Sequence, residues 1–84
     1  MRVTLYSAPD CGLCRDAEAV LRRLQKKSGF ELEVVDIEQD EAAHRLYWAR
    51  IPVVLADGRE VAAAPIDERA LRKLVGGSRL KGQG

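Results

Sequence analysis

The chain has 84 residues, 46% of them apolar, which suits one domain with a single modest core. Its 14 basic and 13 acidic residues give a net charge of +1, so charge offers no reason to expect nucleic acid or anionic lipid as a partner. The sequence shows neither a signal-peptide pattern nor the roughly 20 apolar residues of a membrane span. A secreted domain of this size usually carries several disulfides, whereas this chain has only two cysteines. We therefore expect a cytoplasmic monomer without a membrane partner.

The first half of the chain reads as a strand, a helix and a second strand. Residues 3–6 form a short strand pattern, and Asp10 is placed to cap a helix over 11–27. Apolar residues recur there at helical spacing, at Leu13, Ala17, Val20, Leu21 and Leu24. Gly29 ends the helix, and alternation over 30–37 indicates the next strand. A unit of this kind predicts two parallel strands.

The second half adds a helix, a hairpin and a last helix. We expect a helix over 39–47, then strands over 53–55 and 60–63 joined by a turn at Asp57 and Gly58. The last helix begins at a cap, Asp67. Its inward residues are Ala70, Leu71, Leu74 and Val75.

The predicted order is therefore βαβαββα, an α/β fold with a four-stranded mixed sheet flanked by three helices. Residues 1–75 form the domain, and the glycine-rich residues 76–84 form a disordered tail.

Cys11 and Cys14 carry the chemistry that the sequence suggests. They lie where the first strand gives way to the first helix, the usual place for a site in an α/β sheet. Unpaired amides and the helix dipole stabilise a thiolate at that position. We predict that Cys11 is the exposed nucleophile and that Cys14, one turn on, resolves the mixed disulfide. The neighbouring carboxylate of Asp10 opposes ionisation of Cys11 unless it turns back to cap the helix.

Two other uses of the cysteine pair stay open at this point. A purely structural disulfide would close so short a loop that it restricts the unfolded chain little. The spacing is also half of a four-thiolate zinc or iron–sulfur site, whose missing ligands would come from a second copy. The only histidine, His44, lies in a polar helical stretch and is expected to be exposed, so we assign no metal ligand within one chain.

The run from Leu5 to Cys14, with Arg50, Ile51 and Pro52 some forty residues later, resembles the glutaredoxin and thioredoxin superfamily. The similarity is greatest to small bacterial glutaredoxin-like proteins with a Cys-x-Leu-Cys motif. It implies a cis Pro52 beside Cys11, whereas an X-Pro bond by itself is cis only about 5% of the time. It also implies that the backbone of Ile51 pairs with an extended substrate. Tyr6 matches an aromatic residue common in the first strand of that family.

Several positions depart from the glutaredoxins that use glutathione. Ala8 stands where those proteins usually carry a cation, and Gly12 and Leu13 stand between the cysteines in place of Pro-Tyr. The segment over 62–67 lacks the Gly-Gly stretch that holds glutathione, and only Asp67 matches. Arg50 could supply a cation to an anionic substrate.

From these observations we expect a dithiol–disulfide oxidoreductase without a bound cofactor. It would reduce protein disulfides or glutathione mixed disulfides through Cys11 and Cys14. Ile51, Pro52, Tyr6, Arg50 and Asp67 are the candidate substrate-binding residues. The electron donor would be glutathione or a reductase. The rival interpretations are a binding module that holds a metal or cluster between two copies, and a redox-regulated adaptor without turnover.

Overall fold

The computed structural model describes residues 1–64, 69, 71 and 72. Its elements are β1 (Arg2–Ser7), α1 (Gly12–Ser28), β2 (Glu31–Asp36), the 3-10 helix η1 (Ile37–Gln39), α2 (Glu41–Tyr47), β3 (Val53–Ala56) and β4 (Arg59–Ala63). The expected strands and first two helices are confirmed within two residues at each end. The short helix η1 is an addition, since this stretch was expected to be partly strand and partly helix.

The third expected helix lies mostly outside the described residues. Of its predicted range, positions 69, 71 and 72 are described, and all three are helical. Leu71 is fully buried, in agreement with its predicted inward side. Asp67 and the residues over 76–84 also lie outside the described residues.

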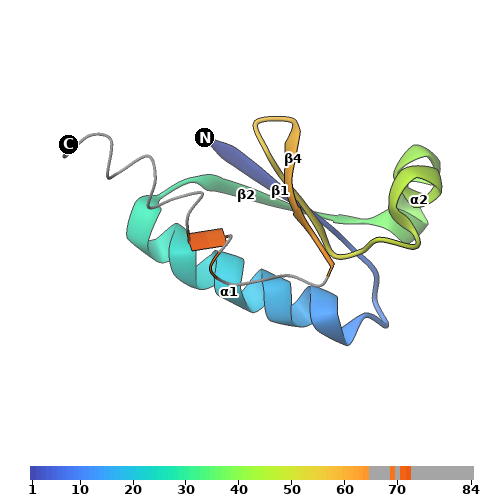
Figure 1. Ribbon diagram of the computed structural model, residues 1–84, viewed down its shortest axis with the longest axis horizontal. Helices are drawn as coiled ribbons and strands as arrows, with labels where there is room; N and C mark the ends of the chain where they lie inside the picture. The colour runs from blue at the N-terminus through green and yellow to red at the C-terminus, as the bar shows by residue number, and fades with distance from the viewer. Residues whose placement is uncertain (65–68, 70, 73–84) are drawn as a thin grey trace.

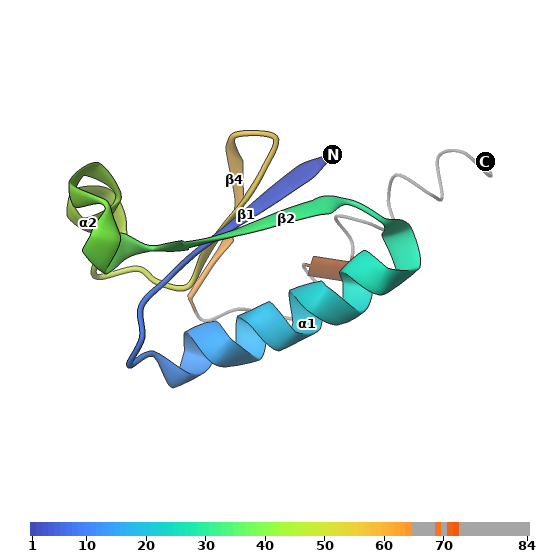
Figure 2. The ribbon, with the colours of Figure 1, turned by 180° about the vertical axis from the view of Figure 1, so that it is seen from behind.

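The four strands form one mixed sheet in the order β2-β1-β3-β4. β1 pairs with β2 in parallel, as the predicted strand–helix–strand unit requires, and the other two pairings are antiparallel. In Figures 1 and 2, α1 runs along the sheet, whereas α2 lies at one of its ends. Strand β1 is central because it lies between β2 and β3 in this order, and the chain leaves it directly toward α1 (Figure 1).

The core lies between α1 and one face of the sheet. Val3 and Leu5 of β1 are completely buried, as is Leu21 of α1. Burying each such side chain contributes about 1.5–3 kcal/mol relative to leaving it exposed. The whole buried cluster consists of Val3, Leu5, Ala17, Leu21, Phe30, Val54 and Leu71. This packing fixes α1 against β1, and so fixes where the helix begins.

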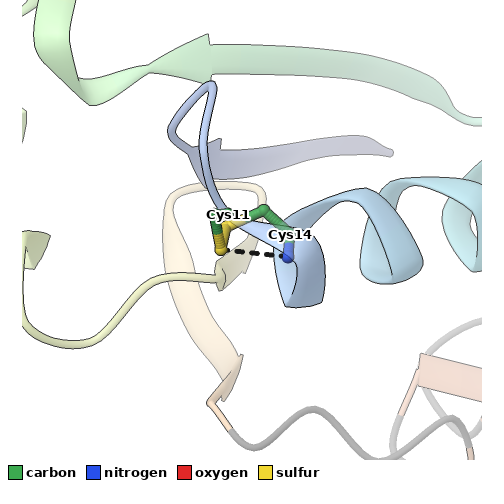
Figure 3. Close-up of a disulfide and its surroundings, with 2 residues drawn as sticks. All are labelled: Cys11 and Cys14. Carbon is green, nitrogen blue, oxygen red and sulfur yellow. Dashed lines mark hydrogen bonds between the residues drawn. A yellow bond between two sulfur atoms is a disulfide. The ribbon is translucent and has the colours of Figure 1, made fainter.

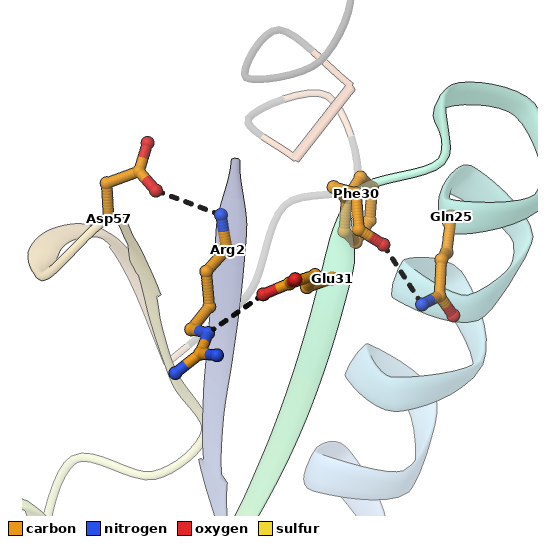
Figure 4. Close-up of polar contacts among 5 residues, drawn as sticks. All are labelled: Arg2, Gln25, Phe30, Glu31 and Asp57. Atoms are coloured by element: carbon orange, nitrogen blue, oxygen red, sulfur yellow. Dashed lines mark hydrogen bonds and ion pairs between the residues drawn. The ribbon is translucent and has the colours of Figure 1, made fainter.

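Caps and turns hold the end of the sheet that is remote from the cysteines (Figure 4). Asp57 and Gly58 both have positive φ, 51° and 86°, as the predicted two-residue hairpin turn requires. The Asp57 carboxylate accepts a hydrogen bond from the Arg2 backbone N–H at 2.9 Å. Gly29 ends α1 in the left-handed region, and Gln25 donates its side-chain N–H to the Phe30 carbonyl at 3.0 Å. These contacts join the hairpin to β1 and the end of α1 to β2.

No helix within the described ranges is long and apolar enough to span a membrane.

Candidate active site

The candidate site lies at the end of the sheet where β1 and β2 end and β3 begins, which we call the site end. Ser7 pairs with Asp36 there, and Tyr6 pairs with Val53. This register places Pro52 across from Ser7. Because α1 follows β1 after a four-residue loop, the start of α1 lies at this same end.

A tight turn delivers Cys11 to the start of the helix. The Cys11 N–H donates to the Ala8 carbonyl at 3.2 Å, which closes a turn with Pro9 at the position where proline is favoured. The residue that caps α1 is Cys11, not Asp10 as the sequence suggested. The turn ends with Cys11 in an extended conformation, φ −102° and ψ 104°, so the chain becomes helical one residue later than predicted. A cysteine thus stands where a capping carboxylate was expected.

The two cysteines form a disulfide across the first turn of α1, with their Cα atoms 5.2 Å apart (Figure 3). The Cys11 Sγ also accepts a hydrogen bond from the Cys14 backbone N–H at 3.1 Å. Cys11 is partly exposed, whereas Cys14 is only 2% exposed. A donor amide therefore already points at the more accessible sulfur, and it would stabilise that sulfur as a thiolate.

The Asp10 side chain is exposed and does not cap the helix. Neither of its carboxylate oxygens accepts a hydrogen bond within the described part of the chain. The Asp10 carboxylate is thus next to Cys11 in sequence and makes no capping hydrogen bond to α1. Its negative charge therefore opposes ionisation of the Cys11 thiol.

The segment that enters β3 is held against the rest of the site end by backbone hydrogen bonds. The Ile51–Pro52 bond is cis, as the family resemblance implied. The Tyr47 carbonyl accepts the N–H groups of Arg50 and Ile51, at 2.8 and 3.1 Å. Pro52 is almost fully buried, whereas Ile51 is partly exposed. The backbone before the proline is therefore fixed by contacts with α2.

Tyr6 takes part in this support. Its ring packs on the ring of Tyr47 at a centroid distance of 4.5 Å. Burial, followed by the nearby charges of Tyr47, Asp40 and Glu33, raises the pKa of Tyr6 above its ordinary value. The phenol thus stays neutral at physiological pH. Tyr6 is partly buried and contacts the residue that anchors the proline segment, so its contact with a substrate stays a prediction.

Arg50, the candidate cation of the site, forms an ion pair with Glu60 of β4. Its carbonyl also accepts the Ala64 N–H at 3.4 Å. Asp67, the remaining candidate, lies outside the described residues. The structure therefore brings Cys11, Cys14, Ile51 and Pro52 to one end of the sheet. Arg50 precedes Ile51 in the chain, but its side chain is paired with Glu60 of β4.

Two features of the site were not predicted. Leu13, between the cysteines, belongs to the expected inward stripe of α1 but is 58% exposed, because Cys14 forms the buried side of this first turn of the helix. Glu60 is the other, since nothing in its sequence position signals a contact with Arg50. A shallow cavity of about 230 Å³ also borders Cys14, Pro9 and Asp36.

The described residues contain no group of three or more histidine, cysteine or carboxylate side chains arranged to hold a metal ion. Cys11 and Cys14 could supply two thiolates to a metal once reduced, and the other ligands would have to come from another chain.

Comparison with known proteins agrees with this geometry. The profile of the glutaredoxin-like domain family (DUF836) matches residues 2–76. The chain belongs to this family. The glutaredoxin-like chain is also 29% identical over 76 residues to an uncharacterized protein of Mycobacterium tuberculosis, covering 84% of this chain and 78% of the relative.

Solved structures place the glutaredoxin-like chain in the thioredoxin-like α/β fold. Protein Ne2328 from Nitrosomonas europaea, solved by solution NMR, superposes with a TM-score of 0.73 at 37% identity, over 88% of this chain and 89% of that one. A thioredoxin from Fasciola hepatica superposes with a TM-score of 0.66 at 30% identity, over 90% of this chain and 78% of that one. The fold that the sequence resemblance implied is therefore confirmed for the sheet and the two described helices.

Proposed function

We propose that this glutaredoxin-like protein is a thiol–disulfide oxidoreductase in which Cys11 attacks the substrate and Cys14 releases it. The observation that supports this most directly is the asymmetry of the pair. Cys11 is partly exposed, and its Sγ accepts a hydrogen bond from the backbone N–H of Cys14, whereas Cys14 itself is buried. An accessible nucleophile with a protected partner is the arrangement that a two-step exchange needs.

The reaction balances as two successive thiol–disulfide exchanges. The Cys11 thiolate attacks one sulfur of the substrate disulfide, which forms a mixed disulfide and releases the first substrate thiolate. Cys14 then loses its proton and attacks Cys11 Sγ, which releases the second substrate thiolate and forms the Cys11–Cys14 disulfide. Two electrons and two protons pass from the protein dithiol to the substrate. An external thiol donor, either glutathione or the dithiol of a reductase, returns them to the protein.

The surroundings of the disulfide favour an extended substrate. Ile51 is partly exposed at the start of β3, and its position is fixed by the Tyr47 carbonyl. Leu13 adds exposed apolar surface between the cysteines. A substrate chain lying against Ile51 would bring its disulfide toward Cys11, with apolar contacts to Leu13. Protein disulfides are therefore the proposed substrates.

The test compares Cys11→Ser with Cys14→Ser in insulin reduction and in hydroxyethyl disulfide reduction. Each assay is run with glutathione and with a thioredoxin reductase as donor. We expect Cys11→Ser to lose all activity, since the accessible nucleophile is removed and the remaining thiol of Cys14 is buried. Without an added donor, reduced Cys14→Ser should still capture the substrate and accumulate a mixed disulfide on Cys11, visible by mass spectrometry. If the wild type is as inert as Cys11→Ser with every donor, the proposal is wrong.

The same proteins separate the two rival interpretations. A metal or cluster shared by two copies would appear as bound metal in a dimer on size-exclusion chromatography, and Cys11→Ser would lose both. A redox-regulated adaptor would form the Cys11–Cys14 disulfide reversibly but would show no turnover.

A further inference from the structure

The ion pair between Arg50 and Glu60 joins the proline segment to the edge strand β4. Arg50 immediately precedes Ile51 and the cis Pro52, beside the proposed substrate position. Its guanidinium Nη2 contacts the Glu60 carboxylate, and its carbonyl accepts the Ala64 N–H at 3.4 Å. The side chain of Arg50 is thus tied to β4, and its backbone to the residue that follows β4.

The strand register shows where this contact holds the guanidinium. Ala63 pairs with Val53 at the site end, but Glu60 pairs with Leu55, further back along the sheet. Arg50 must therefore extend its side chain away from the site end to reach Glu60. The Glu60 carboxylate also compensates the positive charge of the Arg50 guanidinium and occupies the position that an anionic ligand would take.

We propose that Glu60 is a specificity-determining residue that makes the site favour uncharged disulfides over disulfides that carry carboxylates. This inference rests on the proposed oxidoreductase function and adds the substrate class. Glu60 competes with any substrate carboxylate for Arg50, and it does so from within the same chain, where its effective concentration is high. The site then offers a substrate a neutral ion pair in place of a free cation.

A second ion pair in the sheet provides a matched control. Arg2 of β1 and Glu31 of β2 are paired at 3.2 Å, and both are exposed (Figure 4). This pair lies at the opposite end of the strands from Ser7 and Asp36. Glu31→Gln therefore removes the same charge from the same sheet, but far from the disulfide.

The experiment measures single-turnover oxidation of the reduced, desalted protein by two small disulfides. One is uncharged, hydroxyethyl disulfide, and the other carries two carboxylates, dithiodipropionate. Each converts the protein dithiol to the Cys11–Cys14 disulfide and yields two small thiols, so no further donor is needed. The quantity compared among variants is the ratio of the rate with the anionic disulfide to the rate with the uncharged one.

We expect Glu60→Gln to raise this ratio about twofold to fivefold at low ionic strength, the range typical of one exposed ion pair. The gain should shrink at high salt, since exposed charges are screened. It should vanish in the double variant Glu60→Gln with Arg50→Gln, and Glu31→Gln should leave the ratio at the wild-type value.

Two results would overturn the inference while leaving the oxidoreductase proposal intact. One is an unchanged ratio in Glu60→Gln whose reaction with hydroxyethyl disulfide is normal. The other is an equal gain in Glu31→Gln, which would indicate only the net charge of the protein. If the wild type reacts with neither disulfide, the proposed function itself fails. The pair is partly exposed, so circular dichroism should show all variants folded.

Discussion

The glycines at the two ends of α1, Gly12 and Gly29, should respond in opposite directions to the same substitution. Gly29 follows the helix with φ 74°, a conformation that costs an L-residue about 1 kcal/mol or more. Gly12 is the first residue of α1 and does not have positive φ. A Cβ added at either glycine would meet no heavy atom within 4 Å, so sterics cannot account for a difference. Only the backbone conformation distinguishes the two sites.

These facts set the expected magnitudes. Gly29→Ala should lower the free energy of unfolding by about 1 kcal/mol, which is a fall of about 4–8 °C in Tm for a domain of this size. Gly12→Ala should raise it by about 0.5 kcal/mol, because alanine restricts the unfolded chain and fits the helix. Gly29→Asn should lose less than Gly29→Ala, since asparagine tolerates the left-handed region better.

Differential scanning calorimetry of the oxidised proteins measures all three variants with the disulfide held constant. The reasoning would be refuted if Gly29→Ala proved neutral, or if both alanine variants shifted Tm in the same direction. Either result would mean that backbone conformation at the ends of α1 does not control its stability.

Three further predictions concern the surroundings of the cysteines. The pKa of Tyr6 is raised in the folded protein, so the neutral phenol contributes its full stabilisation below pH 10, and this stabilisation is lost as pH rises through the folded pKa. Tyr6→Phe should therefore lose less unfolding free energy than the wild type between pH 9 and pH 11. Urea titrations in which both proteins lose the same free energy over this range would contradict the prediction. Asp10→Asn should speed alkylation of Cys11 in the reduced protein at pH 7, by up to about fivefold, because a nearby negative charge is removed; an unchanged iodoacetamide rate would show that Asp10 has no effect on the thiolate. Asp40 caps α2 by accepting a hydrogen bond from the Ala43 N–H at 3.1 Å. Asp40→Ala should therefore lower the free energy of unfolding, measured in urea, by about 1 kcal/mol. Asp40→Ser should lose much less, because serine also caps helices; an equal loss in both variants would show that capping is not the cause.

The local elements followed from the sequence because short-range physics decides them. The spacing of Ala17 and Leu21 predicted α1, and Gly29 predicted where it ends. Asp57 and Gly58 predicted the hairpin turn, since few other dipeptides adopt two positive φ angles at low cost. The cysteine spacing at a strand–helix junction predicted the position of the disulfide. Each of these depends on residues a few positions apart.

Two details beside the cysteines could not be deduced in this way. The sequence suggested Asp10 as the cap of α1, but the turn that the Cys11 N–H closes on the Ala8 carbonyl leaves Cys11 as the cap. Leu13 has helical spacing typical of a buried residue, but in the structure Cys14 occupies the buried side of that turn and Leu13 is exposed.

The sequence by itself determined that this chain carries a Cys-x-x-Cys pair at the start of a helix in an α/β domain. The sequence predicted that Cys11 is the more exposed cysteine, but only the tertiary structure decided that Cys14 is almost completely buried, because burial depends on how α1 packs across the sheet. The tertiary structure also decided that Arg50 pairs with Glu60, since that contact depends on the register of β3 and β4 and no local pattern encodes it.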